Sequence, residues 1–263
     1  MALREPWEPP VWIAPGRSAD LARVRLVCLP YAGGGASIFR RWIAALAPGI
    51  DVRAVQLPGR ENRMQEPPFT ALEPLVAALA DAIRPWLDRP YALFGASMGT
   101  LIAFELARVL AAGPAGPPAK LFVAAHRAPH LPDLGPELHR LPDATFLDEL
   151  RRLHGMPDEV LAHPELRALL LPLLRADFTA CETYRFRPGP LLDCPIVAFG
   201  GSEDGEVTRK DLEAWREQTR AAFTLRMLPG NHFFVQSARA ALLAAIAEEL
   251  SPLVAGGRKL GPW

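Results

Sequence analysis

The stretch Tyr91-Ala92-Leu93-Phe94-Gly95-Ala96-Ser97-Met98-Gly99-Thr100 decides the fold of this chain. Its first residues are apolar and typical of a strand, and the apolar run that follows is typical of a helix. Between them lies Gly-x-Ser-x-Gly, the pattern of a sharp strand-to-helix turn in which glycines avoid collisions of Cβ atoms. Such a turn presents its serine at the top of a sheet. We therefore expect Ser97 to be a nucleophile; the alternative is a serine that only caps the following helix.

The composition argues against several classes of protein. The 263 residues hold 29 Lys and Arg against 29 Asp and Glu, so the overall charge favours neither a nucleic acid nor an anionic membrane as partner. Cys28, Cys181 and Cys194 lack metal-ligand spacing and predict reduced thiols. The N-terminal residues carry charges and prolines where a signal peptide needs an apolar segment, and no later run approaches a membrane span. We expect a soluble, cytoplasmic protein with no metal or redox cofactor.

Apolar runs alternate with helical patterns along most of the chain, which predicts an α/β fold with a mostly parallel sheet and helices on both faces. One domain over residues 1–263 is expected. Strands are predicted at 25–30, 51–58, 91–94, 121–125, 195–199 and 223–228. Helices are predicted at 38–47, from a capping box of Thr70 and Glu73 to about residue 87, at 101–110 and 208–221, and finally to about residue 250.

The alternation stops between about residues 130 and 190, where no strand-like run occurs. Helical patterns at 143–154 and 165–184, with a turn at 156–160 between them, predict a helical lid inserted in the domain. Pro172 should kink or break the second helix. The run 168–174 around it is apolar on all sides, which fits either a helix beside an acyl-binding channel or an ordinary core helix.

A serine nucleophile needs a base, and the base needs a carboxylate that fixes its tautomer. In a hydrolase of this layout, the acid and the histidine follow the serine on loops after late strands. His232 follows the last predicted strand and is the expected base, with His126 as the runner-up. Glu203 and Asp204 share the loop after the preceding strand, and the pattern alone does not separate them; Asp193 lies at the wrong end of that strand.

The loop from Tyr31 to Ser37 contains three consecutive glycines but no lysine of a phosphate-binding loop. In a hydrolase of this layout, one oxyanion donor is the backbone N–H after the nucleophile and the other comes from an early strand-to-helix loop. We therefore expect the N–H groups of Met98 and Ala32 to form an oxyanion hole. The alternative is a flexible turn.

Several motifs together resemble the type II thioesterases, the free-standing thioesterases of polyketide and nonribosomal peptide assembly lines. The resemblance covers about residues 25–250 and rests on Leu29-Pro30-Tyr31-Ala32-Gly33-Gly34, Leu57-Pro58-Gly59-Arg60, Gly95-Ala96-Ser97-Met98-Gly99, residues 153–160 (Leu-His-Gly-Met-Pro-Asp-Glu-Val) and Pro229-Gly230-Asn231-His232-Phe233-Phe234. It implies an α/β-hydrolase fold. It also implies hydrolysis of acyl groups, often aberrant or stalled, from the phosphopantetheine arm of an acyl or peptidyl carrier protein as partner.

The resemblance also separates the two candidate acids. The family's Gly-Gly-x-x-Asp-x-x-Val pattern falls on residues 200–207 and favours Asp204 over Glu203. Asn231 stands where the family often has a second glycine, a departure that affects the local loop and not the base.

The resulting hypothesis is that Ser97, activated by His232 and oriented by Asp204, attacks a thioester while the Ala32 and Met98 amides hold the oxyanion. Water then releases the acyl-enzyme. Two alternatives stay open: a carboxylesterase or acyltransferase with the same triad, and a catalytically inactive protein that binds carrier proteins. Arginines in and beside the insertion are expected either to contact the carrier protein or to form a solvated helix face; they are Arg151, Arg152, Arg167, Arg175, Arg185 and Arg187.

Overall fold

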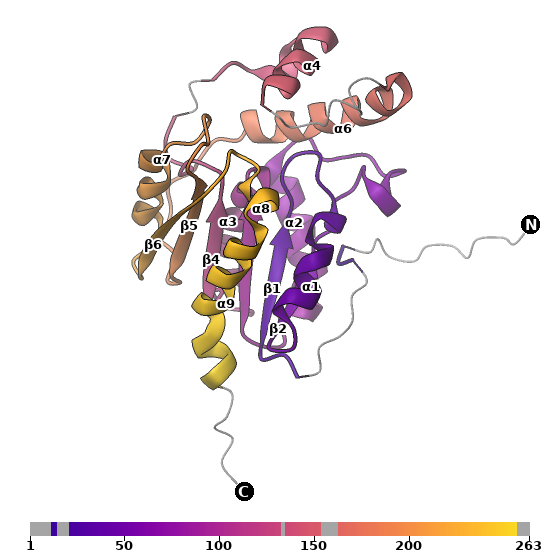
Figure 1. Cartoon of the computed structure of the whole chain (residues 1–263). Coiled ribbons are helices and arrows are strands. Elements are labelled where there is room, and N and C mark those ends of the chain that lie inside the picture. Colours follow the sequence, from indigo (N-terminus) through magenta and orange to yellow (C-terminus); the bar gives the residue numbers. More distant parts are fainter. Residues whose placement is uncertain (1–11, 15–20, 133–134, 154–162, 257–263) are drawn as a thin grey trace, which may run out of the picture.

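Six parallel strands form the centre of the computed structural model, which describes residues 12–14, 21–132, 135–153 and 163–256 (Figure 1). The strand order is β2-β1-β3-β4-β5-β6. The predicted parallel sheet is therefore confirmed. The strands are β1 (Val24–Leu29), β2 (Ile50–Ala54), β3 (Tyr91–Ala96), β4 (Lys120–Ala124), β5 (Ile196–Gly201) and β6 (Phe223–Leu228).

Helices cover both faces of the sheet, which explains why β1, β3 and β5 are buried along their whole length. On one face, Trp42 and Phe39 pack against Phe94 of β3, together with residues of the last two helices. On the other face, Phe104 packs against Trp215. The helices are α1 (Arg40–Leu46), α2 (Leu72–Ile83), α3 (Met98–Ala111), α4 (Asp143–Arg152), α6 (Pro164–Glu182), α7 (Arg209–Glu213), α8 (Phe234–Ser237) and α9 (Arg239–Gly256).

The insertion between β4 and β5 carries α4 and α6, which lie across the carboxyl ends of the strands (Figure 1). It has a small apolar cluster of its own, formed by Leu138, Phe146, Leu150 and Leu174. Helix α6 continues through Pro172 without interruption, so of the kink or break expected there the break is wrong. A proline removes one helical hydrogen bond, and the neighbouring Leu173 and Leu174 are buried, so their packing holds the helix across that gap. The turn expected at 156–160 lies outside the described residues.

The apolar run 168–174 divides into two parts. Leu169 is 49% exposed, whereas Leu173 and Leu174 are 4% and 5% exposed. Leu170 and Leu171 are half-buried against the cluster of the insertion, so burial along the run increases toward its carboxyl-terminal end, where Leu174 lines a cavity.

Several boundaries differ from those predicted, and three of the differences concern the helices α2, α7 and α9. The capping box of Thr70 and Glu73 is absent, because α2 begins at Leu72 after an extended Ala71. A helix capped by Thr70 would need the N–H of residue 74 to bond the Thr70 carbonyl, and Pro74 has no N–H. The helix expected at 208–221 is the short α7 followed by a 3₁₀ helix, Ala214–Gln218. The last helix runs beyond residue 250 to Gly256.

None of the helices in the described part of the chain is both long and apolar enough to cross a membrane. The cytoplasmic location expected from the sequence stays a prediction.

Candidate active site

Ser97 lies at the turn between β3 and α3 with φ 49° and ψ −116°, a conformation that costs a residue with a Cβ atom roughly 1–3 kcal/mol. The two flanking glycines make this turn possible. A Cβ on Gly95 would lie 2.2 Å from the carbonyl oxygen of Gly99, and a Cβ on Gly99 would lie 2.3 Å from that of Leu29. Tight packing against β1 therefore forces Ser97 out at the carboxyl end of the sheet, which is the geometry of a nucleophile elbow.

His232 and Asp204 lie beside this serine. The Nε2 atom of His232, on the loop after β6, is 3.1 Å from the Oγ of Ser97. Its Nδ1 atom is 3.0 Å from Oδ2 of Asp204, on the loop after β5. Three residues from loops after three strands thus form a continuous row from carboxylate to imidazole to hydroxyl.

The carboxylate of Asp204 is held in an ionised and fixed state. Its side chain is fully buried, and its Oδ1 accepts the backbone N–H groups of Glu206 (2.9 Å) and Val207 (3.2 Å). Burial raises the pKa of Asp204. Hydrogen bonding and charge from His232, together with these two amides, lower the pKa by more than burial raises it, so it lies below the usual value. Such a carboxylate fixes the tautomer of the imidazole and stabilises the imidazolium.

The other candidate acids and bases lie elsewhere. Glu203 is exposed, and Asp193 pairs with Arg220 at 2.8 Å at the opposite end of β5. His126 lines the cavity beside Ser97, but its Nδ1 atom faces the carbonyl oxygen of Arg127 at 2.7 Å. The structure thus brings together Ser97, His232 and Asp204, and it leaves the runner-up residues outside that row.

Ala32 and Met98 line the same cavity as Ser97 and His232. Met98 is the first residue of α3, so its N–H has no carbonyl one turn earlier to bond. In the loop after β1, the amides of Gly33, Gly34 and Ala36 each donate a hydrogen bond. The Ala32 amide has no such bond to any of the residues that the structure describes. Two N–H groups are thus available beside Ser97.

The cavity beside Ser97 has a volume of about 240 Å³ and a mainly apolar wall. The insertion supplies about half of the residues that line this cavity. The sequence predicted a lid but not which side chains line the cavity, because periodicity identifies helices but not the direction in which each face points. Its apolar residues include Leu138, Leu150, Leu153, Leu174 and Phe178 of the insertion together with Tyr31 and Phe233, and its charged residues are Arg127, Arg152, Glu182 and Glu206.

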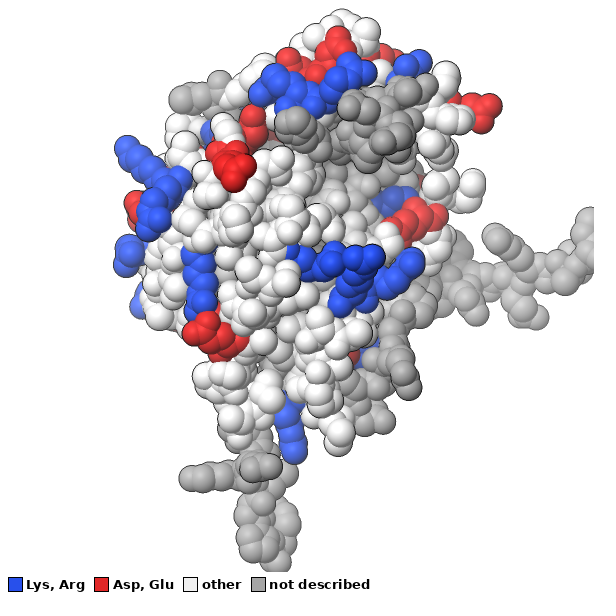
Figure 2. Space-filling view, in the orientation of Figure 1, with Lys and Arg blue, Asp and Glu red and all other residues white. Residues whose placement is uncertain are grey.

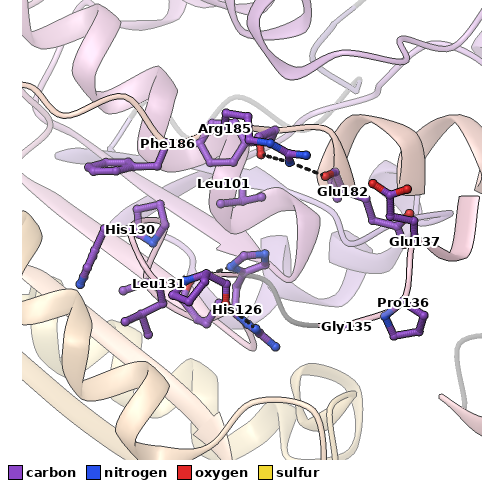
Figure 3. A pocket seen from close by; sticks show the side chains of 16 residues that line it. Leu101, His126, His130, Leu131, Gly135, Pro136, Glu137, Glu182, Arg185 and Phe186 are labelled. Carbon is purple, nitrogen blue, oxygen red and sulfur yellow. Dashed lines mark hydrogen bonds between the residues drawn. The ribbon is translucent and has the colours of Figure 1, made fainter.

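A larger hollow of about 470 Å³ lies next to this cavity, and Figure 3 shows it with Leu101 and Phe186 on one side and His126, His130 and Leu131 on the other. Ser97 does not line it. The carboxylate of Glu182 at its edge is held by the amides of Leu138 and His139, each at 3.0 Å. Despite its size, this hollow is not the place where Ser97 would react.

Two of the three cysteine thiols in the described part of the chain are unfavourably placed to react. Cys28 and Cys194 are buried thiols, and burial raises the pKa of both, that of Cys194 to about 11. Among the residues that the structure describes, no three His, Cys, Asp or Glu side chains are grouped so that they could hold a metal ion.

Comparison with known proteins gives a family and several similar proteins. The model of the family described as thioesterase domain matches residues 24–251. The chain is 43% identical over 244 residues to the gramicidin S biosynthesis protein GrsT of Aneurinibacillus migulanus, covering 93% of this chain and 95% of that protein. Among solved structures it is similar to the RedJ thioesterase of the prodiginine pathway in Streptomyces coelicolor, with a TM-score of 0.83, 43% identity and coverage of 95% and 91% of the two chains. It is also similar to the type II thioesterase BorB of the borrelidin cluster, with a TM-score of 0.82, 41% identity and coverage of 93% and 99%.

Proposed function

The chain belongs to the thioesterase domain family, has the α/β-hydrolase fold and is a hydrolase of thioesters, and from this premise we propose that Ser97, His232 and Asp204 are its catalytic triad. The observation that carries the proposal is the row of contacts at 3.1 Å and 3.0 Å that joins the three side chains. The orientation of Asp204 by two backbone amides supports the same assignment.

In the proposed reaction, His232 takes the proton of Ser97 as its Oγ attacks the thioester carbonyl carbon. The carbonyl oxygen becomes an oxyanion, which the N–H groups of Ala32 and Met98 stabilise. The C–S bond then breaks, and the leaving thiolate takes the proton from the imidazolium. Water, deprotonated by His232, attacks the acyl-enzyme and releases the carboxylic acid and Ser97.

The proposed substrates are acyl or peptidyl groups, often aberrant or stalled, on the phosphopantetheine arm of a carrier protein. Support comes from the similar proteins, whose names place them in the biosynthesis of gramicidin S, prodiginine and borrelidin. The apolar cavity beside Ser97 suits the acyl group of such a thioester.

Most of the arginines that we considered for carrier recognition already have local partners. Figure 2 shows positive and negative side chains side by side over the top of the molecule, where α4 and α6 lie. The ion pairs are Arg151 with Asp148 (2.9 Å), Arg152 with Glu149 (2.8 Å) and Glu206 (3.1 Å), Arg175 with Asp143 (2.6 Å) and Arg187 with Glu73 (3.8 Å). The carrier protein would therefore meet a surface of mixed charge.

The carrier is tested by presenting one acyl group on two donors, an acyl carrier protein and the short thiol pantetheine. We expect higher kcat/KM from the carrier protein, because its surface adds contacts that the thiol lacks. Because most of these arginines are paired, we expect that advantage to fall only about twofold or less between low and physiological salt. Intact-mass analysis of a panel of acyl carrier proteins reads the released group. Equal kcat/KM for both donors at low salt would exclude recognition of the protein part.

We further propose that residues 1–263 form one domain in which the insertion, about residues 130–190, acts as a lid over the acyl group. Phe178 of α6 lines the cavity beside Ser97, and its ring meets that of Phe146 edge-on at 5.4 Å. Phe146 is fully buried in the same cluster but does not line the cavity. The two phenylalanines therefore form a matched pair for separating the lining of the cavity from the stability of the insertion.

Phe178→Ala should lengthen the cavity and raise the kcat/KM ratio of long over short acyl thioesters several-fold, since each further buried methylene contributes up to about 0.8 kcal/mol. Phe146→Ala should leave that ratio unchanged although it loosens the same cluster. The measurement is kcat/KM over a series of acyl chain lengths. An equal shift in both variants would mean that loosening of the insertion, and not the cavity lining, sets chain length.

A further inference from the structure

A helix of the insertion holds the loop that carries the Ala32 N–H. The adjacent Gly33 N–H donates to Oδ2 of Asp177, on α6, at 2.7 Å. The same carboxylate accepts two bonds of 2.8 Å from the guanidinium of Arg60, which also donates to the carbonyl oxygen of Gly34 at 3.2 Å. The carboxylate of Asp177 therefore fixes Gly33 directly and fixes Gly34 through Arg60.

This contact is buried and closely packed. The side chains of Arg60 and Asp177 are 5% and 4% exposed. Gly33 has φ 76°, and a Cβ there would lie 2.7 Å from Cδ2 of Leu174, which lies one helical turn before Asp177 on the same face of α6. A Cβ on Gly59 would likewise approach Cδ1 of Leu173 to 3.3 Å. The helix thus meets both glycine loops at van der Waals distance, and its position sets the position of the loop after β1.

A buried ion pair is a weak source of stability, because removing both charges from water offsets most of their attraction, and apolar replacements are often equally stable. The pair bonds three backbone groups, and two of them, the N–H of Gly33 and the carbonyl of Gly34, lie in the loop next to Ala32; the third is the carbonyl of Pro58. An oxyanion donor acts only when its N–H points at the developing charge.

We propose that Asp177 and Arg60 are positioning residues that align the Ala32 N–H with the oxyanion, so that docking of α6 completes the oxyanion hole. This inference rests on the proposed role of Ala32. Under this proposal, the reactivity of Ser97 depends on the position of α6, which also lines the acyl cavity through Leu174 and Phe178.

The test compares variants that break the contact with one that leaves it intact. Asp177→Ala removes the acceptor of the Gly33 N–H, and Asp177→Asn keeps the shape of the side chain but not its charge. The double variant Arg60→Met/Asp177→Leu leaves no unpaired buried charge, so it should fold even if Asp177→Ala does not. Asp143→Ala is the matched control, because Asp143 also pairs with α6, through Arg175 at 2.6 Å, but does not contact the loop after β1.

In the three contact-breaking variants we expect kcat to fall about tenfold to a hundredfold, below the loss of a whole oxyanion donor, with KM changed less than about threefold. Asp177→Asn should show the smallest loss. Asp143→Ala should stay within about twofold of wild type.

A trifluoromethyl ketone analogue of the substrate separates alignment from general loosening. Ser97 Oγ adds to its carbonyl carbon, the serine proton passes to His232, and the ketone oxygen becomes an anion in the oxyanion hole. Its affinity should fall by the same factor as kcat, whereas an unreactive thioether analogue should bind all variants equally. Equal losses for both analogues would overturn the inference in favour of a structural role.

Amide hydrogen exchange over residues 31–35 gives a readout that does not depend on activity. Exchange should be faster in the contact-breaking variants than in Asp143→Ala. If exchange is unchanged, α6 does not hold the loop and the inference fails, while the proposed triad stands. If exchange is faster but kcat and ketone affinity are unchanged, the inference fails together with the assignment of Ala32. The proposed triad is tested separately, by variants of Ser97, His232 and Asp204.

Discussion

Replacing Ser97 with alanine is expected to lower kcat on an acyl thioester by about a thousandfold or more, because the variant loses the hydroxyl that His232 activates to form the acyl-enzyme. Replacing His232 with alanine should cost nearly as much, since nucleophile and base act as one unit. Alanine at position 97 must adopt the same positive φ as serine, so the Ser97→Ala variant should unfold at nearly the wild-type temperature.

The measurement is single-turnover kinetics, with acyl-enzyme formation followed by intact mass. Ser251→Ala, an exposed serine on α9, is the control and should retain wild-type turnover. Turnover within about tenfold of wild type for Ser97→Ala or His232→Ala would remove that residue from the triad.

Asp204→Asn is expected to lower kcat by up to about ten thousandfold, because the amide favours the wrong imidazole tautomer and cannot stabilise the imidazolium. Glu203→Gln changes the neighbouring carboxylate in the same way and should leave kcat nearly unchanged, since Glu203 is exposed. A larger loss in the Glu203 variant would reverse the assignment of the acid.

The stability of these variants should differ in its pH dependence. The pKa of Asp204 is lowered in the folded protein, so its ionised form favours folding above the unfolded aspartate value of about 3.9. This contribution is lost as the pH falls through the lower, folded-state pKa. Urea unfolding of wild type from pH 6 to 3 should therefore show an acid decrease that is smaller in Asp204→Asn. Parallel curves would mean that Asp204 is not held in its ionised form by the fold.

Local sequence signals predicted those parts of the molecule that local physics determines. The strand Phe223–Leu228 matches its prediction, because a short apolar run bounded by turn residues specifies its own ends. Thr70 did not cap α2, because Pro74 shifts the start of that helix. Pro172 did not break α6, because packing of the following turns outweighs one missing hydrogen bond.

In the candidate site, too, the sequence predicted some residues and not others. The Gly-x-Ser-x-Gly turn and the chain order pointed to Ser97 and His232, whereas choosing Asp204 over Glu203 needed the resemblance to a family. Nothing in the sequence pointed to the contact of Arg60 with Asp177, because its partners are 117 residues apart and a charged residue in a helix usually faces solvent. The cavity wall was equally hidden, since tertiary packing sets the rotation of α4 and α6.

The separate apolar cluster of the insertion has a consequence for how such enzymes diverge. Because Leu150 lines the acyl cavity but packs within the insertion and not in either sheet core, mutations there can reshape the cavity while the elbow at Ser97 stays intact. The face of α6 that holds Leu174 and Asp177 is not free in this way, since it also supports the loop after β1. Lineages that acquire new substrates should therefore accumulate changes on α4 and on the outward side of α6. The inward face of α6 should change little, because it contacts both the acyl cavity and the loop that carries Ala32.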